Sequence, residues 1–377
     1  MTLAACSSNS ATTTTTSSGA TTTTGGSAGA TTTPANPAAG LSAFETSPAS
    51  AVSLSETGSS LLYPLFGAWA VGVKKQWPNL SVTTASTGSG AGISGAESGT
   101  VDIGASDAYL PAATVASTPG LEDIPLAISA QQVDYNVPGI PASTHLKLTG
   151  AVLADIYSGK ITKWNDSAIA ALNPGAPLPS TTIVPLHRSD SSGDTFLFST
   201  YLNSSDPSGW VAAAGGESPS ITFPAISSAV AETGNSGMLQ GCKQTSGCVA
   251  YIGISYLTQA IAAGLGEAQL QNKSGNFELP TTATIHAEAA SFTQVPASGA
   301  ISLIYGPATD GYPIINFEYA IVLGGHASAA VAKAVQATLA WAMDPRYGSA
   351  ASYLDVVHFQ PLPASALSVA IALLKKI

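Results

Sequence analysis

The chain has 377 residues, of which 45% are hydrophobic, so it can bury enough apolar surface for two domains of ordinary size. Only 9% of residues are charged, and 22 acidic against 12 basic side chains give a formal net charge of -10. This balance excludes nonspecific attraction to nucleic acid or to an anionic membrane surface. Arg188 and Arg346 are the only arginines, so an anion site must rely mainly on hydroxyls, backbone N–H groups and helix N-termini.

The first six residues predict a lipid attachment site. Cys6 follows Leu3-Ala4-Ala5 and precedes a long polar tract, which resembles the lipobox of a bacterial lipoprotein, where the cysteine is acylated, for example with palmitate. The basic region and most of the apolar region of a signal peptide are missing, so residues 1–6 are interpreted as a truncated signal. The alternative is a chance cysteine near a start codon.

Residues 7–51 consist of Ser, Thr, Ala, Gly and Pro with almost no large apolar side chain. Such a segment cannot bury enough surface to fold, so it is predicted to be a disordered tether. No run of 18 or more apolar residues occurs in the sequence, and the chain is therefore not expected to span a membrane. Any membrane attachment would be through Cys6.

From Val52 onward, strand-like and helix-like segments alternate, which predicts an α/β fold with mostly parallel sheets. A first amphipathic helix is indicated by apolar residues at three- and four-residue steps, namely Leu62, Leu65, Phe66, Trp69 and Ala70. The predicted strands that follow are 81–83, 101–104, 183–186, 249–252 and 319–323. The predicted helices that follow are 90–98, 149–157, 195–202, 255–263 and 327–343.

Three loops rich in Ser, Thr and Gly each precede a predicted helix, at 57–60, 87–92 and 188–195. At such a junction the free N–H groups of the first helical turn and the capping hydroxyl form a receptor for an oxyanion. Simple helix capping would explain any one of these loops. Three of them in one weakly charged chain, the last containing one of only two arginines, favour convergence on a single anionic ligand.

Asp107 comes shortly after the predicted strand at 101–104, where loops reach the carboxyl edge of a sheet and ligands usually bind. An ionised Asp only accepts hydrogen bonds, so it can bind an O–H of phosphate but nothing on fully ionised sulfate. A site built around Asp107 would therefore select its ligand by rejecting anions without a proton. The alternative is that Asp107 is an N-cap or turn residue.

Cys242 and Cys248 lie in a short segment flanked by glycine, and this spacing predicts a small disulfide loop in an oxidising compartment. Two free thiols or a metal site are the alternatives. A metal would need further ligands, and the chain has no second cysteine pair and only five dispersed His residues.

Motifs for catalysis are absent from the sequence. It contains no Gly-x-Ser-x-Gly, Ser-x-x-Lys or His-x-x-x-His pattern, and the loop at 88–92 lacks the Lys of a phosphate-binding P-loop. His187 is the one candidate base, and we interpret it as structural because neighbouring residues at a strand end point to opposite faces. The sequence therefore predicts a protein that is not an enzyme and needs no cofactor. A surface adhesin or structural lipoprotein is a further class to consider.

Six segments in order resemble the signatures of the phosphate-binding protein of the Pst phosphate ABC importer. They are 56–66, 88–92, 102–107, 156–165, 172–175 and 187–196. The closest likeness is to the lipid-anchored mycobacterial and actinobacterial type, which the chain also resembles at 241–254 and 312–315. The resemblance covers about residues 52–362, nearly all of the predicted folded body.

The resemblance implies a type II periplasmic-binding fold, in which two α/β lobes joined by two crossover strands enclose the ligand in a cleft. Lobe I would comprise residues 52–128 plus 302–377, and lobe II residues 129–301. The protein would act as a monomer on the outer face of the cell membrane. There it would deliver inorganic phosphate to the permease and ATPase subunits of the importer by cleft closure.

The resemblance also implies which residues bind phosphate. Ser60, the backbone of Leu61, and Ser89 would donate from lobe I, where Asp107 would accept the phosphate proton. Lobe II would contribute Arg188, oriented by Asp190, together with Ser192, Gly193 and Asp194. An Arg that is half neutralised and oriented in this way binds an anion without making the cleft indiscriminately cationic.

Asp194 departs from the family pattern, which has Thr there, and Ser60-Leu61 replaces the Thr-Phe of many members. The second change preserves one hydroxyl and one N–H, but the first replaces a donor by an acceptor. If Asp194 contacts the ligand, two acceptors would require two protons, and the site would prefer monobasic phosphate, with affinity rising as pH falls. The alternative is that Asp194 accepts from a neighbouring hydroxyl or N–H and never contacts the ligand's proton.

Overall fold

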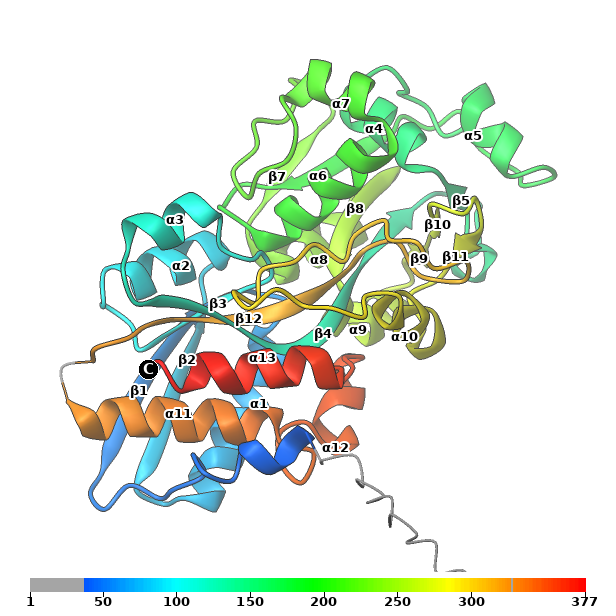
Figure 1. Ribbon diagram of the computed structural model, residues 1–377. Coiled ribbons are helices and arrows are strands. Elements are labelled where there is room, and N and C mark those ends of the chain that lie inside the picture. Colours follow the sequence, from blue (N-terminus) through cyan, green and yellow to red (C-terminus); the bar gives the residue numbers. More distant parts are fainter. Residues whose placement is uncertain (1–36, 327) are drawn as a thin grey trace, which may run out of the picture. The chain divides into compact units, whose positions relative to one another are not determined.

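The computed structural model describes residues 37–326 and 328–377 (Figure 1). Cys6, with its predicted acylation, and residues 7–36 of the predicted tether lie outside the described residues. The remaining tether residues include a 3₁₀ helix, η1 (Pro37–Gly40), and the side chain of Leu41 is fully buried. The compact unit runs from Pro37 to Ile377, so it begins before Val52. Within the described ranges, no helix is both long enough and apolar enough to cross a membrane.

Within the same ranges, one nine-stranded sheet has the order β2-β1-β3-β12-β4-β8-β6-β7, with β9 paired to β4. Its strands are β1 (Val52–Gly58), β2 (Leu80–Ser86), β3 (Ile103–Ser106), β4 (Leu121–Asn136), β6 (Val184–Arg188), β7 (Val230–Glu232), β8 (Cys248–Gly253), β9 (Gly266–Glu267) and β12 (Ile315–Leu323). A small second sheet contains β5 (Lys147–Leu148), β10 (Gln269–Gln271) and β11 (Phe277–Glu278).

Parallel pairing is confined to the two flanks of the large sheet, where β1 pairs with β2 and β3, and β6 pairs with β7 and β8. The pairings of β12 with β3, β12 with β4 and β4 with β8 are antiparallel. The sheet is therefore mixed rather than mostly parallel. The five predicted strands all overlap strands of this sheet.

Strand β4 joins the two flanks, because it pairs with β12 over Leu121–Ala130 and then with β8 over Gln131–Asn136 (Figure 1). Sequence patterning did not predict this strand. It contains Pro125, which is unusual in a central strand, and the register shifts there at a bulge opposite Glu318 and Tyr319. Nearly all of β4 is buried, which suits a strand with neighbours on both sides.

The longer helices are α1 (Tyr63–Gln76), α2 (Ser89–Glu97), α4 (Gly150–Tyr157), α6 (Gly193–Ser205), α7 (Pro207–Ala214), α8 (Gly234–Gln244), α10 (Thr282–Ala290), α11 (Ala329–Met343) and α13 (Ala364–Leu374). Shorter ones are α3 (Ala112–Ser117), α5 (Ser167–Leu172), α9 (Leu257–Ala262), α12 (Ala351–Leu354), η2 (Ala142–Thr144), η3 (Ile254–Tyr256) and η4 (Asp355–Val357). Each helix predicted from periodicity has a counterpart here, and α1 buries the face that its spacing indicated.

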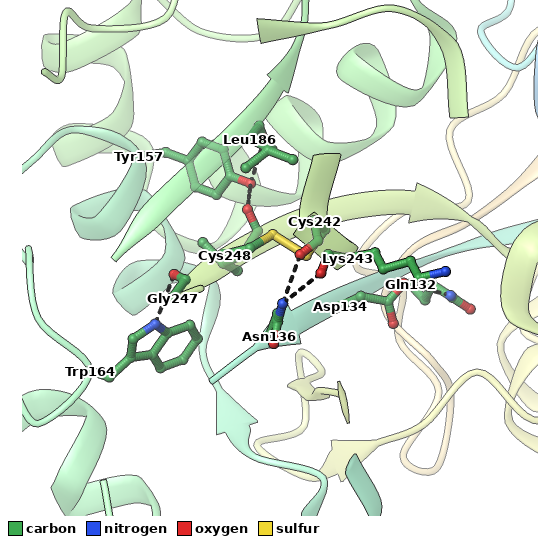
Figure 2. Close-up of a disulfide and its surroundings, with 11 residues drawn as sticks. Gln132, Asp134, Asn136, Tyr157, Trp164, Leu186, Cys242, Lys243, Gly247 and Cys248 are labelled. Carbon is green, nitrogen blue, oxygen red and sulfur yellow. Dashed lines mark hydrogen bonds between the residues drawn. A yellow bond between two sulfur atoms is a disulfide. The ribbon is translucent and has the colours of Figure 1, made fainter. Parts of the chain in front are cut away.

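Cys242 and Cys248 form the predicted disulfide, which joins the end of α8 to the start of β8 (Figure 2). Both cysteines are fully buried. The side-chain amide of Asn136 donates to the backbone oxygens of Cys242 and Lys243, at 3.1 and 3.0 Å. Trp164 Nε1 donates to the backbone oxygen of Gly247 at 2.9 Å. The disulfide thus lies at a junction that is already well hydrogen-bonded.

Replacing both Cys242 and Cys248 by Ser is expected to lower the free energy of unfolding by about 2 kcal/mol, the loop-closure value for a short loop. Urea unfolding monitored by tryptophan fluorescence measures the change, and wild-type protein treated with a reductant is the control. The reductant should shift the wild-type midpoint to that of the double variant and leave the double variant unchanged. An unchanged midpoint in the double variant would contradict the expectation.

Candidate functional site

The three predicted loops come together at one edge of the sheet. They follow β1, β2 and β6, and they lead into α1, α2 and α6. The backbone N–H of Gly90 in the second loop donates to the backbone oxygen of Ser191 in the third, at 3.1 Å. Ser59 N in the first loop donates to the backbone oxygen of Ala105 on β3 at 2.9 Å, beside Asp107. The convergence predicted from three separate stretches of sequence is therefore present.

Asp107 directly follows β3 and is only 2% exposed. Its Oδ1 accepts a hydrogen bond from Ser59 Oγ, and its Oδ2 accepts one from Ser89 Oγ at 3.2 Å. Burial and, after it, the nearby charge of Asp194 raise the pKa of Asp107 from 3.8 to about 7, against the opposing effects of Ser59, Glu318 and Arg188. Asp107 is thus a buried acceptor among hydroxyl donors.

Gly193, the first residue of α6, lies directly opposite Asp107. A Cβ added at Gly193 would lie 2.5 Å from Asp107 Oδ2 and 2.6 Å from Ser89 Oγ, so only glycine permits this approach. Ser192 caps the helix, since its Oγ accepts from Thr195 N at 3.3 Å. The N-terminus of α6, where the helix dipole is positive, therefore lies against the carboxyl group of Asp107.

Arg188 is the cation of the site, and its side chain is 1% exposed. Its Nε donates to Asp190 Oδ1 at 2.7 Å, and its Nη2 donates to Asp190 Oδ2. Its Nη1 donates to Asp194 Oδ2 at 2.8 Å. Burial would raise the pKa of Asp190, but the hydrogen bonds and charge of Arg188 outweigh it and lower that pKa. Arg188 thus faces two carboxylates, not one.

Asp194 is fully buried and receives donors on both oxygens. Its Oδ1 accepts from Gln131 Nε2 at 3.1 Å, and its Oδ2 accepts from Asn235 Nδ2 at 2.7 Å as well as from Arg188. Burial raises the pKa of Asp194, although Arg188 and the two amides act against it. These contacts favour the alternative in which Asp194 binds neighbouring donors instead of the ligand's proton.

Asn235 contacts several members of the site but was not predicted from the sequence. Its backbone N and its Nδ2 both donate to Ser60 Oγ, at 3.1 and 2.9 Å, and its Oδ1 accepts from Gly253 N at 2.7 Å. Leu61 is linked to the same side, because its backbone oxygen accepts from Ser255 Oγ at 2.8 Å. Asn235 follows β7 through Gly234 in the first turn of α8, which repeats the strand, glycine, polar residue and helix pattern of the three loops.

The local charges decide what the site can bind. Arg188 contributes one positive charge, whereas Asp107, Asp190 and Asp194 are three carboxyl groups close to it. Attraction to an anion must then come from hydroxyls, N–H groups and the α6 N-terminus. His187 stacks on Phe223 with ring centroids 4.8 Å apart, which matches its structural interpretation. Among the described residues, no cluster of His, Cys, Asp or Glu is arranged for a metal ion.

Known phosphate-binding proteins resemble this chain over most of its length. Residues 8–346 match the model of the PBP superfamily domain. The phosphate-binding protein PstS of Pasteurella multocida is 36% identical over 323 residues, covering 83% of this chain and 87% of the relative. PstS of Xylella fastidiosa is 32% identical over 314 residues, covering 83% of this chain and 82% of the relative. PstS 2 of Mycobacterium tuberculosis is 29% identical over 301 residues, covering 76% and 77%.

Solved structures share the fold. The periplasmic phosphate-binding protein PfluDING, bound with phosphate, has a TM-score of 0.67 at 20% identity and covers 85% of this chain and 93% of its own. The phosphate binding protein of Stenotrophomonas maltophilia has a TM-score of 0.62 at 18% identity, covering 85% and 94%.

The fold and the site together define a solute-binding protein with the predicted type II periplasmic-binding fold. The chain belongs to the PstS family of phosphate-binding proteins within the PBP superfamily. Members of this family bind and deliver a substrate for transport and are not enzymes, as the sequence predicted.

Proposed function

We propose that this protein binds inorganic phosphate outside the cytoplasm and delivers it to the permease and ATPase subunits of an ABC importer. The observation that carries the proposal is Asp107, a buried carboxyl group that faces the N-terminus of α6 and accepts hydrogen bonds from Ser59 and Ser89. An anion that brings its own proton can bind such an acceptor, and phosphate is an abundant anion of this kind. The sequence relatives named for phosphate binding support the same ligand.

The proposed phosphate contacts come from both flanks of the large sheet. Ser60, Leu61, Ser89 and Asp107 belong to the β1, β2 and β3 side. Arg188, Ser192 and Gly193 belong to the β6 side, where Asp190 and Asp194 neutralise Arg188. In this arrangement the guanidinium orients the site, while hydroxyls and N–H groups supply most of the attraction. Sulfate is rejected because it would place a charged acceptor against Asp107.

Binding requires the two sides to separate, because residues that would surround phosphate contact each other directly. Gly193 lies against Asp107 and Ser89, and the neighbouring contacts of Ser60 with Asn235 and of Gly90 with Ser191 also cross from one flank to the other. We propose that lobe I (52–128 plus 302–377) and lobe II (129–301) open for phosphate and close on it. Closure then shifts the population toward the form that the permease binds.

Calorimetric titration with phosphate, arsenate and sulfate at two pH values tests this function. Phosphate and arsenate should bind, because both bring a proton to Asp107 at neutral pH, and sulfate should not. Equal binding of sulfate and phosphate would overturn the proposal, as would the absence of phosphate binding.

The role of Asp194 is tested by the substitution Asp194→Asn. If Asp194 mainly neutralises Arg188, the variant leaves more positive charge facing the ligand, and phosphate affinity should rise by about tenfold. If Asp194 accepts a second proton from monobasic phosphate, the same variant should bind phosphate more weakly, most clearly at low pH. Phosphate titrations at several pH values distinguish the two outcomes, because the phosphate affinity of the variant rises in the first case and falls in the second. Sulfate should remain unbound, since Asp107 is unchanged.

We also propose that the protein is a monomer attached to the outer face of the cell membrane by an acylated Cys6. The lipobox-like segment ending at Cys6 supports the anchor, and the polar tract after it supports a spacer. Mass spectrometry of the protein expressed in a bacterium that processes lipoproteins should find lipid on Cys6, and Cys6→Ala should release the protein from the membrane fraction.

A further inference from the structure

Glu318 is a fully buried carboxyl group that the proposed phosphate contacts do not use. It lies on β12, where its Oε1 accepts from Ser129 Oγ at 2.5 Å and from Asn316 Nδ2 at 3.1 Å. Its Oε2 accepts from no donor in the ranges 37–326 and 328–377. A buried carboxylate oxygen without a partner is costly, so the state of Oε2 needs a physical explanation.

The pairing of β12 with β3 brings Glu318 next to Asp107. Tyr319 is opposite Ser106, so Glu318 and Asp107 adjoin paired positions on neighbouring strands. Asn316 Nδ2 also donates to the backbone oxygen of Asp107, at 3.1 Å. The two carboxyl groups also affect each other's pKa: the charge of Asp107 raises the pKa of Glu318, and a hydrogen bond from Glu318 lowers that of Asp107. Two ionised carboxylates cannot bond each other, so the pair must share a proton.

The surroundings of the two groups indicate which one has the proton. Asp107 accepts from two hydroxyls, although the charge of Asp194 raises its pKa by more than the charge of Arg188 lowers it. In the part of the chain that the structure describes, the donors to Glu318 are neutral, namely the hydroxyl of Ser129 on β4 and the amide of Asn316 on β12. The phenol of Tyr319 is a further titratable group near Glu318. Burial, and after it the charge of Asp107, raise the pKa of Glu318 well above its usual value.

We propose that Glu318 is a positioning residue, which retains its proton at neutral pH and donates it from Oε2 to Asp107, so that Asp107 stays an ionised acceptor for the O–H of phosphate. This inference rests on the proposed phosphate site. No proton is transferred to the ligand: Glu318 retains its own, and phosphate retains the one that Asp107 accepts. At higher pH, loss of the Glu318 proton places a second negative charge beside Asp107, and phosphate affinity falls.

The variants Glu318→Gln and Glu318→Leu distinguish the effect of the hydrogen-bond donor at position 318 from the effect of its negative charge. Gln retains a donor and cannot ionise, so E318Q should bind phosphate within about threefold of wild type near neutral pH and retain that affinity to higher pH than wild type does. Leu removes the donor, so E318L should bind about tenfold more weakly or worse. Calorimetric phosphate titrations from about pH 6 to about pH 9 measure how the phosphate affinity of each variant depends on pH.

Glu288→Gln is the matched control. Glu288 is a second fully buried carboxyl group, on α10, and burial raises its pKa to about 7. Since it contacts Gly306 and Ala308 instead of Asp107, E288Q should follow the wild-type pH profile. Infrared difference spectra of wild type and E318Q should also show, at neutral pH, a protonated-carboxyl C=O band that E318Q lacks.

Superimposable pH profiles for wild type and E318Q, or the absence of that infrared band, would overturn the proposal. The band does not depend on phosphate. If wild-type protein binds no phosphate, the proposed function fails, while the infrared spectra still decide whether Glu318 has a proton. If E318L does not fold, the comparison of wild type, E318Q and E288Q remains sufficient.

Discussion

Asp107→Asn is expected to lower phosphate affinity by about 10- to 100-fold and to remove most of the preference for phosphate over sulfate. Asn has nearly the same shape, but one of its two terminal groups is a donor. The side chain therefore no longer presents a charged acceptor to the phosphate O–H, and it no longer repels an anion without a proton. Calorimetric titrations with phosphate and sulfate, at one pH and ionic strength, measure both changes.

The same variant is expected to be more stable than wild type at high pH although it binds phosphate more weakly. This difference in sign separates lost binding from misfolding. Burial, and after it the charge of Asp194, raise the pKa of Asp107 from 3.8 to about 7. The folded state thus binds this proton more tightly than the unfolded state, and the associated stability is complete below about pH 4 and lost as pH rises through about 7. Without phosphate, D107N should unfold at a higher temperature than wild type above about pH 7, and the gap should shrink toward about pH 4.

Asp155→Asn is a control for these measurements, because Asp155 pairs with Lys160 at the exposed surface. It should leave both the anion preference and the pH dependence of unfolding unchanged. Weaker phosphate binding by D107N together with a lower unfolding temperature at high pH would contradict the role given to Asp107.

The parts of the site that could be predicted from the sequence are those encoded locally. Each loop combines Ser or Thr with Gly at the end of a strand, and such a junction orients N–H groups whatever surrounds it. Asp107 could be placed for the same reason, since a short apolar strand precedes it directly. The bidentate contact between Arg188 and Asp190 also lies within one loop.

The parts that could not be predicted depend on pairings between distant segments. Asp194 binds Gln131 and Asn235, which are far from it in the chain, so its residue type alone left its role open. Glu318 could have been singled out, because a Glu inside the apolar run of β12 is unusual, but its neighbour Asp107 follows only from the antiparallel pairing of β12 with β3. That pairing also explains why a mostly parallel sheet was the wrong expectation for the centre of the molecule.

Arg188→Met is expected to remove most phosphate binding and to lower the free energy of unfolding by about 3–5 kcal/mol. Met fills similar volume, but Asp194, which is fully buried, and Asp190, which is partly buried, both lose the cation that they share. In wild type, Arg188 lowers the pKa of Asp190 despite its burial, so this stabilisation is present above the unfolded pKa and lost as pH falls through the folded one. The stability gap between wild type and R188M should therefore narrow in acid. Urea unfolding at several pH values measures it.

Adding Asp194→Asn to Arg188→Met tests the cause of that loss. If the destabilisation comes from uncompensated carboxylates, the double variant should recover part of the unfolding free energy that R188M loses, although it should still not bind phosphate tightly. Arg346→Met, at the only other arginine, is the control: its side chain is 56% exposed, so water can replace it beside Asp344 and phosphate binding should be unchanged. Additive losses in the double variant would show that Arg188 stabilises the protein by packing, and would contradict the neutralising role given to Asp194.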